Sequence, residues 1–167
     1  MWSCNRRTLL ILALGSVLGA VAACGFTPAY APGGAATKLQ SGIAFDAPID
    51  KDGFDMVERL EQRLGRSQAP LYKLAYRTET TAIGVGITPD AATTRFNITG
   101  SATYTVTDRG TDAVLTGGTV QSFTAYSATG TTVSTLTAQR DASSRLMRLL
   151  ADQIVARLIA TSGAWAK

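Results

Sequence analysis

The stretch that decides the fold is residues 94–107, which read TRFNITGSATYTVT. Apolar side chains recur at every second position, and hydroxyl, amide or guanidinium side chains occupy the positions between them. The apolar series is Phe96, Ile98, Ala102, Tyr104 and Val106, and the polar series is Arg95, Asn97, Thr99, Ser101, Thr103 and Thr105. This alternation is typical of a strand in an antiparallel sheet that packs one face and leaves the other polar.

Two further strands are expected on either side of this segment. Tyr72, Leu74 and Tyr76 alternate with polar or small residues, and Ala113 to Ser127 is rich in threonine, valine and aromatic residues. The parity of the last strand is ambiguous, because Val120 and Phe123 cannot share a face unless a bulge lies near Gly117-Gly118.

A short strand and a short helix are predicted before the sheet. Ile43, Phe45 and Ile49 stand near alternate positions in residues 41–49. Asp50 or Asp52 suits the N-cap of a helix. In that helix Val57, Leu60 and Leu64 share one side with Met56 beside them, and Gly65 suits the C-terminal stop.

A long helix is predicted after the sheet. Residues 133–161 contain neither glycine nor proline, and Gly163 is the expected end. The apolar stripe is Leu146, Leu149, Leu150, Ile154, Leu158 and Ile159. Two helices on the packed face of one sheet predict an α+β fold, a two-layer domain with a four-stranded, mostly antiparallel sheet.

The N-terminal region predicts a lipoprotein leader over residues 1–23. Arg6 and Arg7 precede a thirteen-residue apolar run, Leu9 to Val21, which is too short to span a bilayer of about 30 Å. Small residues then precede Cys24, as in the bacterial lipobox, so a diacylglycerol and an N-acyl chain on Cys24 are expected to hold the mature chain on a membrane surface. A loose twin-arginine pattern is also present, but ordinary secretion is the favoured export route.

The organisation that follows is a lipidated flexible tether over residues 24–40, rich in proline, glycine and alanine, and a folded domain over residues 41–167. Gly25 occupies the position after the cysteine where an acidic residue could have acted as a retention signal. Its presence favours sorting of the lipoprotein to the periplasmic face of the outer membrane.

Composition argues against catalysis and against nucleic-acid binding. Arg6 and Arg7 belong to the leader, so 14 of the 16 basic residues remain against 12 acidic ones, and this small surplus does not predict a nucleic-acid partner. The chain has no histidine, and its one mature cysteine is the acylation site, so no catalytic residue, metal ligand or cofactor other than the acyl chains is expected. A calcium loop at Asp50, Asp52 and Asp55 lacks the glutamate it needs, and helix capping is favoured.

Three cations are the candidate ligand contacts. Lys73, Arg77 and Arg95 are expected on the polar face of the sheet, where they suit phosphate groups. The alternative is that they are solvated side chains that keep the sheet soluble.

Two segments resemble one protein family. Cys24-Gly25-Phe26-Thr27-Pro28-Ala29-Tyr30 is similar to the mature start of the lipopolysaccharide-assembly lipoproteins of the LptE family in their alphaproteobacterial form. The helical segment from Ala138 to Leu158, with Gln153-Ile154-Val155-Ala156-Arg157-Leu158 as its last part, is similar to that family's C-terminal helix, where a Gln-Ile-x-x-Arg-Leu ending recurs.

The resemblance implies two helices on a four-stranded sheet, a place inside the outer-membrane barrel protein LptD, and a role in delivering lipopolysaccharide to the cell surface. It gives no motif that assigns lipid contacts to particular residues. Two alternatives stay open from the residues alone: an auxiliary lipoprotein of another lipid-transport system of the ABC type, and a lipid-anchored hydrolase, which the missing histidine disfavours.

Overall fold

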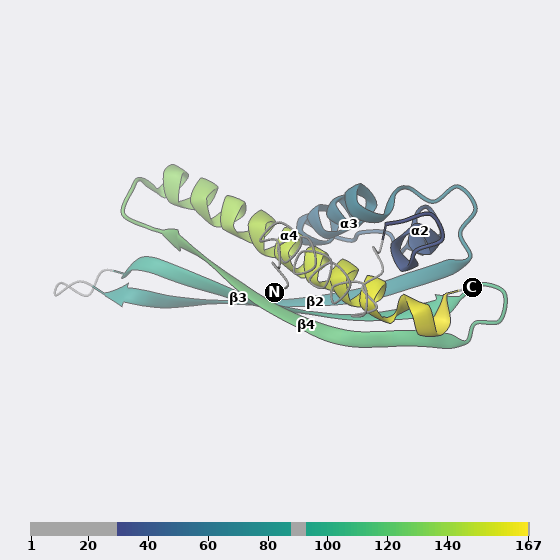
Figure 1. Cartoon of the computed structure of the whole chain (residues 1–167). Coiled ribbons are helices and arrows are strands. Elements are labelled where there is room, and N and C mark those ends of the chain that lie inside the picture. Colours follow the sequence, from purple (N-terminus) through teal and green to yellow (C-terminus); the bar gives the residue numbers. More distant parts are fainter. Residues whose placement is uncertain (1–29, 88–92, 167) are drawn as a thin grey trace, which may run out of the picture.

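The computed structural model describes residues 30–87 and 93–166 as helices packed on one face of a sheet (Figure 1). The elements in chain order are α2 (Ala35–Leu39), β1 (Ile43–Phe45), α3 (Lys51–Leu64), β2 (Tyr72–Ile87), β3 (Thr93–Asp108), β4 (Val114–Ser127) and α4 (Thr132–Trp165). The sheet order is β1-β2-β3-β4, with β1 parallel to β2 and the other pairs antiparallel. The two-layer α+β prediction is confirmed, and α2 adds a third, short helix.

The ladders are regular between residues 72–84 of β2 and 96–108 of β3, and between residues 95–106 of β3 and 116–127 of β4. Within these stretches even-numbered residues lie on the helix side of the sheet and odd-numbered residues on the other side. Leu74 pairs with Val106, and Ala102 pairs with Val120, which is fully buried. Phe123 therefore lies on the opposite face from Val120 and is 66% exposed. Pairing continues without a break through the two glycines near residue 117, and the irregularity of this ladder lies between Val106 and Thr107 instead. A bulge at Gly117-Gly118 is therefore not needed.

Helix α3 begins and ends at the residues that the sequence indicates. The carboxylate of Asp50 accepts a hydrogen bond from the Gly53 N–H at 2.6 Å, which satisfies one of the free donors of the first turn. Gly65 ends the helix with φ +81°, a conformation that favours glycine. The strand prediction was too long, because β1 ends at Phe45 and Ile49 is 97% exposed in the loop that follows.

Helix α4 crosses the whole sheet (Figure 1). Its 34 residues correspond to about 51 Å at about 1.5 Å per residue. Leu146, Leu150, Ile154 and Leu158 are fully buried, whereas Leu149, expected in the same stripe, is 44% exposed. The predicted stop at Gly163 was wrong by two residues, since the helix continues to Trp165, whose ring packs edge-on against Tyr72 at 5.3 Å.

The expected tether, residues 24–40, lies only partly within the described residues. Residues 1–29, which include the leader and Cys24, lie outside them. Residues 35–39 form α2, in which Ala36 and Leu39 are fully buried. Because Leu39 packs into the hydrophobic core and α2 contacts α4, the folded unit begins before residue 41. Within the described part of the chain, no helix is both long enough and apolar enough to cross a membrane.

Candidate functional site

None of the described helices covers the face of the sheet opposite α3 and α4, which we call the open face (Figure 1). It consists of the odd-numbered side chains of β2, β3 and β4. Its middle rows are Arg77, Thr103 and Thr119; then Glu79, Ser101 and Gln121; then Thr81, Thr99 and Phe123. Hydroxyl, amide and charged groups therefore dominate a surface three strands wide.

A shallow hollow of about 460 Å³ lies in the middle of the open face. Thr99 and Ser101 on β3 line it, with Glu79 and Thr81 from β2 on one side and Gln121 and Phe123 from β4 on the other. The Thr99 hydroxyl donates to the Thr81 carbonyl at 3.3 Å. The remaining lone pairs and amide groups are available for hydrogen bonds with a polar partner.

The three predicted cations all lie on this face, but the structure does not bring them together. Lys73 and Arg77 are four residues apart on one strand, which corresponds to about 13 Å. Lys73 pairs with Thr107, and Arg95 stands twelve residues earlier on that same strand, about 40 Å away. One phosphate group cannot contact all three.

The cations also differ in their partners. The Lys73 ammonium lies 3.0 Å from the Asp46 carboxylate, and the Arg77 guanidinium lies 3.4 Å from Glu79. No ion pair links Arg95 to any other residue within 30–87 and 93–166, and its side chain is exposed. Of the three candidate cations, Arg95 is therefore the one without an ion pair in the described residues, although it lines a hollow that Asp141 and Arg145 of α4 also line.

Apolar side chains also lie on the open face, which sequence reasoning did not predict. Phe123 and Ile83 lie there, and both are more than half exposed. Ile83 and Phe123 lie on β2 and β4, one row apart, with Asn97 and Thr99 on β3 between them. The sequence did contain one indication of this. Val120 and Phe123 are three residues apart in a strand, so if Val120 faces the core, Phe123 must face the other side.

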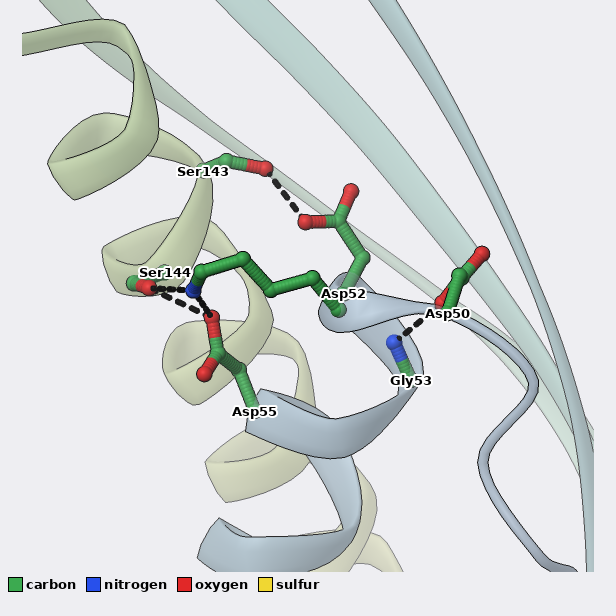
Figure 2. A network of polar contacts seen from close by, with 7 residues as sticks. Asp50, Asp52, Gly53, Asp55, Ser143 and Ser144 are labelled. Atoms are coloured by element: carbon green, nitrogen blue, oxygen red, sulfur yellow. Dashed lines mark hydrogen bonds and ion pairs between the residues drawn. The ribbon is translucent and has the colours of Figure 1, made fainter. Parts of the chain in front are cut away.

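The carboxylates of Asp52 and Asp55, in the first turns of α3, form hydrogen bonds that hold α3 to α4 (Figure 2). Asp52 accepts a hydrogen bond from the Ser143 hydroxyl at 2.8 Å, and Asp55 accepts from the Lys51 ammonium at 2.7 Å and from the Ser144 hydroxyl. Burial raises the pKa of Asp55, but these hydrogen bonds and the positive charges of Lys51 and Arg148 outweigh it, so its pKa lies below the ordinary value.

The same helix pair is joined further along its length. The Arg59 guanidinium donates two hydrogen bonds to Asp152, at 3.0 and 2.9 Å. In the described residues, no group of three or more His, Cys, Asp or Glu side chains is placed to hold a metal ion. We therefore assign these acidic residues to packing of the two helices.

Solved structures with this fold come from several bacteria. A protein from Caulobacter crescentus CB15 described as a lipoprotein aligns with a TM-score of 0.65 and 19% identity, over 78% of this chain and 96% of that one. The rare lipoprotein B from Shewanella oneidensis aligns with a TM-score of 0.56 and 11% identity, over 73% and 95%. Lipoprotein B from Nitrosomonas europaea gives 0.54 and 10%, over 73% and 83%. At these identities the likeness shows the fold.

A comparison with curated proteins finds no match. The family model described as "LptE: Lipopolysaccharide-assembly" matches residues 40–158. The matched range runs from the end of α2 through the sheet and most of α4, so it contains the whole open face. The chain belongs to the LptE family of lipopolysaccharide-assembly proteins.

Proposed function

We propose that this protein is an outer-membrane lipoprotein that assembles with an LptD-like barrel, plugs its lumen, and takes part in lipopolysaccharide transport to the cell surface without catalysing a reaction. The observation that carries the proposal is the open face: three strands wide, rich in hydroxyl groups and without a helix on it. A protein that had to pack this face against an apolar partner would not present rows of threonine, serine and glutamine.

A barrel lumen is a suitable counterpart for such a face. The interior walls of transmembrane barrels are polar, since apolar side chains point out to the lipid. A plug in such a lumen needs groups that exchange hydrogen bonds with water for hydrogen bonds with the wall, and the side chains around Thr99 and Ser101 provide both donors and acceptors. Lipopolysaccharide carries phosphate groups. Of the three candidate cations, Arg95 can bind a phosphate without first giving up an ion pair within the described residues. Lys73 and Arg77 would first have to exchange their carboxylate partners.

The anchor in this proposal is the acylated Cys24. Each buried methylene contributes about 0.8 kcal/mol, so a diacylglycerol together with an N-acyl chain holds far more firmly than one chain. The test is a Cys24→Ala variant in cells that lack the barrel protein, where it should leave the membrane fraction for the soluble fraction. A variant that stays in the outer-membrane fraction without acyl chains would contradict the anchor.

The barrel partnership is tested by blocking the centre of the open face. Ser101→Arg places a long charged side chain in the hollow, whereas Ala156→Arg adds the same side chain on an exposed part of α4. We expect affinity isolation from solubilised membranes to recover at least tenfold less barrel protein with Ser101→Arg and an unchanged amount with Ala156→Arg. Equal recovery with both would refute a role of the open face, and recovery of an inner-membrane ABC transporter instead of a barrel would favour the auxiliary-lipoprotein alternative.

A further inference from the structure

The sheet has two edges, and residues 30–87 and 93–166 protect only one of them along its length. Strand β4 forms one edge, and α4 covers it with polar side chains. The Arg157 guanidinium donates to the Thr119 carbonyl at 2.5 Å, and the Gln153 amide donates to the Gln121 carbonyl at 3.1 Å. Arg145 reaches the Ala125 carbonyl in the same way at 3.4 Å.

The geometry of this covering is regular. Four residues of a helix rise about 6.0 Å, and two residues of a strand rise about 6.6 Å, so side chains from every fourth helical position can meet alternate carbonyls of an adjacent strand. These bonds occupy acceptors that would otherwise pair with another strand. Edge strands left open are templates for strand addition, and proteins commonly cover them.

The opposite edge is covered over only three residues. Strand β1 pairs with Tyr72, Lys73 and Leu74 of β2, and the last bond of that ladder runs from the Asp46 N–H to the Leu74 carbonyl at 3.0 Å. Strand β2 continues to Ile87. Beyond Leu74 none of the described strands lies on that side.

The backbone groups on this side can be identified from the bonds already made. The Tyr72 N–H and the Leu74 carbonyl point toward β1, while the Leu71 carbonyl accepts from Arg109 on the β3 side. Backbone groups of a strand alternate in direction from residue to residue, so the groups of Thr78, Thr80 and Ala82 also point away from β3. From Thr78 to Gly84 the free edge is about 20 Å long at about 3.3 Å per residue.

Proline and lysine, two of the usual protections, are absent from this edge, and Glu79 is its one charged residue. Residues 78–84 read TETTAIG, with no proline and no lysine. The register stays regular as far as Gly84, and the first irregularity follows it. Three threonines and an isoleucine in this stretch favour extended backbone.

A hollow of about 370 Å³ lies where β1 leaves the sheet and the free edge begins. Asp46, Asp50, Tyr76 and Arg77 are among the residues that line it. Burial raises the pKa of Tyr76, and the charges of Asp50 and Asp46 raise it further, which agrees with a negative potential in the hollow. A strand that continues the line of β1 would have its first residue here, next to Asp50, which has no ion pair within the described residues, and to Asp46, whose carboxylate pairs with Lys73 at 3.0 Å.

A second copy of the chain does not fit this edge well. An antiparallel copy that used residues 76–84 fully would be centred on Thr80, and the two Glu79 side chains would then lie at diagonal positions of one face, about 7–8 Å apart. Such a copy would bring Gly84, not a cation, to the hollow. Charge therefore favours a different partner.

We propose that the β2 edge from Thr78 to Gly84 binds an extended polar segment of another protein as an additional strand, with a lysine or arginine of that segment in the hollow at Asp46 and Asp50. The main-chain hydrogen bonds supply affinity, and the basic residue fixes the register. The inference does not depend on which protein supplies the segment, nor on the barrel partnership.

The first test is residue-resolved hydrogen exchange on the full chain in mild detergent. The amides of Thr78, Thr80 and Ala82 should exchange at least a hundredfold faster than those of Glu79 and Thr81, which face β3. Equal protection of the two series would show that the edge is already covered and would overturn the proposal.

The second test uses defined peptides and fluorescence anisotropy. The blocked peptide KTVTVTT or its reverse, TTVTVTK, should bind the full chain saturably below about 1 mM. Methylation of the peptide amides on alternate residues should weaken the better binder at least tenfold, and glutamate in place of its lysine at least fivefold. No binding by either peptide, or equal binding of the methylated form, would overturn the proposal.

Matched variants locate the site. Thr80→Pro removes an outward N–H without breaking the β2–β3 ladder and should weaken peptide binding at least tenfold, whereas Thr80→Val keeps that N–H and should stay within twofold. Unchanged binding to a folded Thr80→Pro variant would refute the assignment. Concentration-dependent dimers in sedimentation that Thr80→Pro abolishes would show that the edge serves self-association instead.

Discussion

The contact between α4 and the middle of β3 depends on the absence of a side chain at Gly100. A Cβ at this position would lie 2.9 Å from Cδ2 and 3.3 Å from Cγ of Leu146, and 3.4 Å from Cδ1 of Leu150. Both leucines are fully buried. Gly100→Ala must therefore shift Leu146 or lift the helix, which costs about 1–3 kcal/mol, and the reduced backbone entropy of alanine returns about 0.5–1 kcal/mol. We expect a net loss of about 1–2 kcal/mol.

The assay is urea unfolding of the full chain, followed by circular dichroism. Gly163→Ala is the matched control, because nothing lies within 4 Å of its added Cβ and the position is helical, so it should gain about 0.5 kcal/mol. Combining Gly100→Ala with Leu146→Ala should recover about 1 kcal/mol relative to the sum of the single changes, since the new methyl group fills part of the space. Additive losses, or a Gly100→Ala variant as stable as the parent, would refute this account of the helix–sheet contact.

Three more changes test other contacts. Asp50→Ala removes the N-cap of α3 and should cost about 1 kcal/mol in urea unfolding, while Asp50→Ser should cost less than half as much. Arg59 and Asp152 are each about one-third exposed, so a double-mutant cycle to alanine should give a coupling below about 1 kcal/mol, and it should shrink in 1 M salt. The pKa of Asp55 is lower in the folded state than in the unfolded state, so its ionised carboxylate stabilises the fold. This contribution should be complete above the ordinary aspartate pKa of about 3.9 and be lost as pH falls through the lower folded value. An Asp55→Asn variant should lose this part of the pH dependence of unfolding, and an unchanged acid profile would contradict the prediction.

The sheet was predictable because its strands carry their pattern locally. In β3 every second residue is apolar, and the face of each side chain follows from parity alone, which is why Lys73, Arg77 and Arg95 were placed on the correct face. Parity does not determine which charged groups meet. The Asp46–Lys73 pair joins a loop to a strand 27 positions later, and it exists because β1 lies beside the start of β2.

The errors at element ends have a common physical origin. Gly163 carries a local cost of about 1 kcal/mol in a helix, yet α4 continues because Trp165 packs against Tyr72. Residues 35–39 look like a linker in composition, yet Leu39 is fully buried in the core. In both cases a contact with a distant part of the chain outweighs a weak local preference, and a single sequence does not reveal such contacts.

The amount of apolar surface in the chain explains why one face of the sheet remains open. Helix α4 is long enough to cross the sheet, and together with α3 it buries the even-numbered apolar side chains in the middle of the sheet, Leu74, Ala102, Val106 and Val120 among them. The odd-numbered positions carry mostly hydroxyl, amide and charged groups, so a second helical layer would gain little hydrophobic free energy there and would have to desolvate those groups. The open face is therefore stable in contact with water or with a polar partner. Specific binding to it must come from hydrogen bonds and shape, and the few exposed apolar groups, Phe123 and Ile83 among them, are the positions where a partner can add hydrophobic contact.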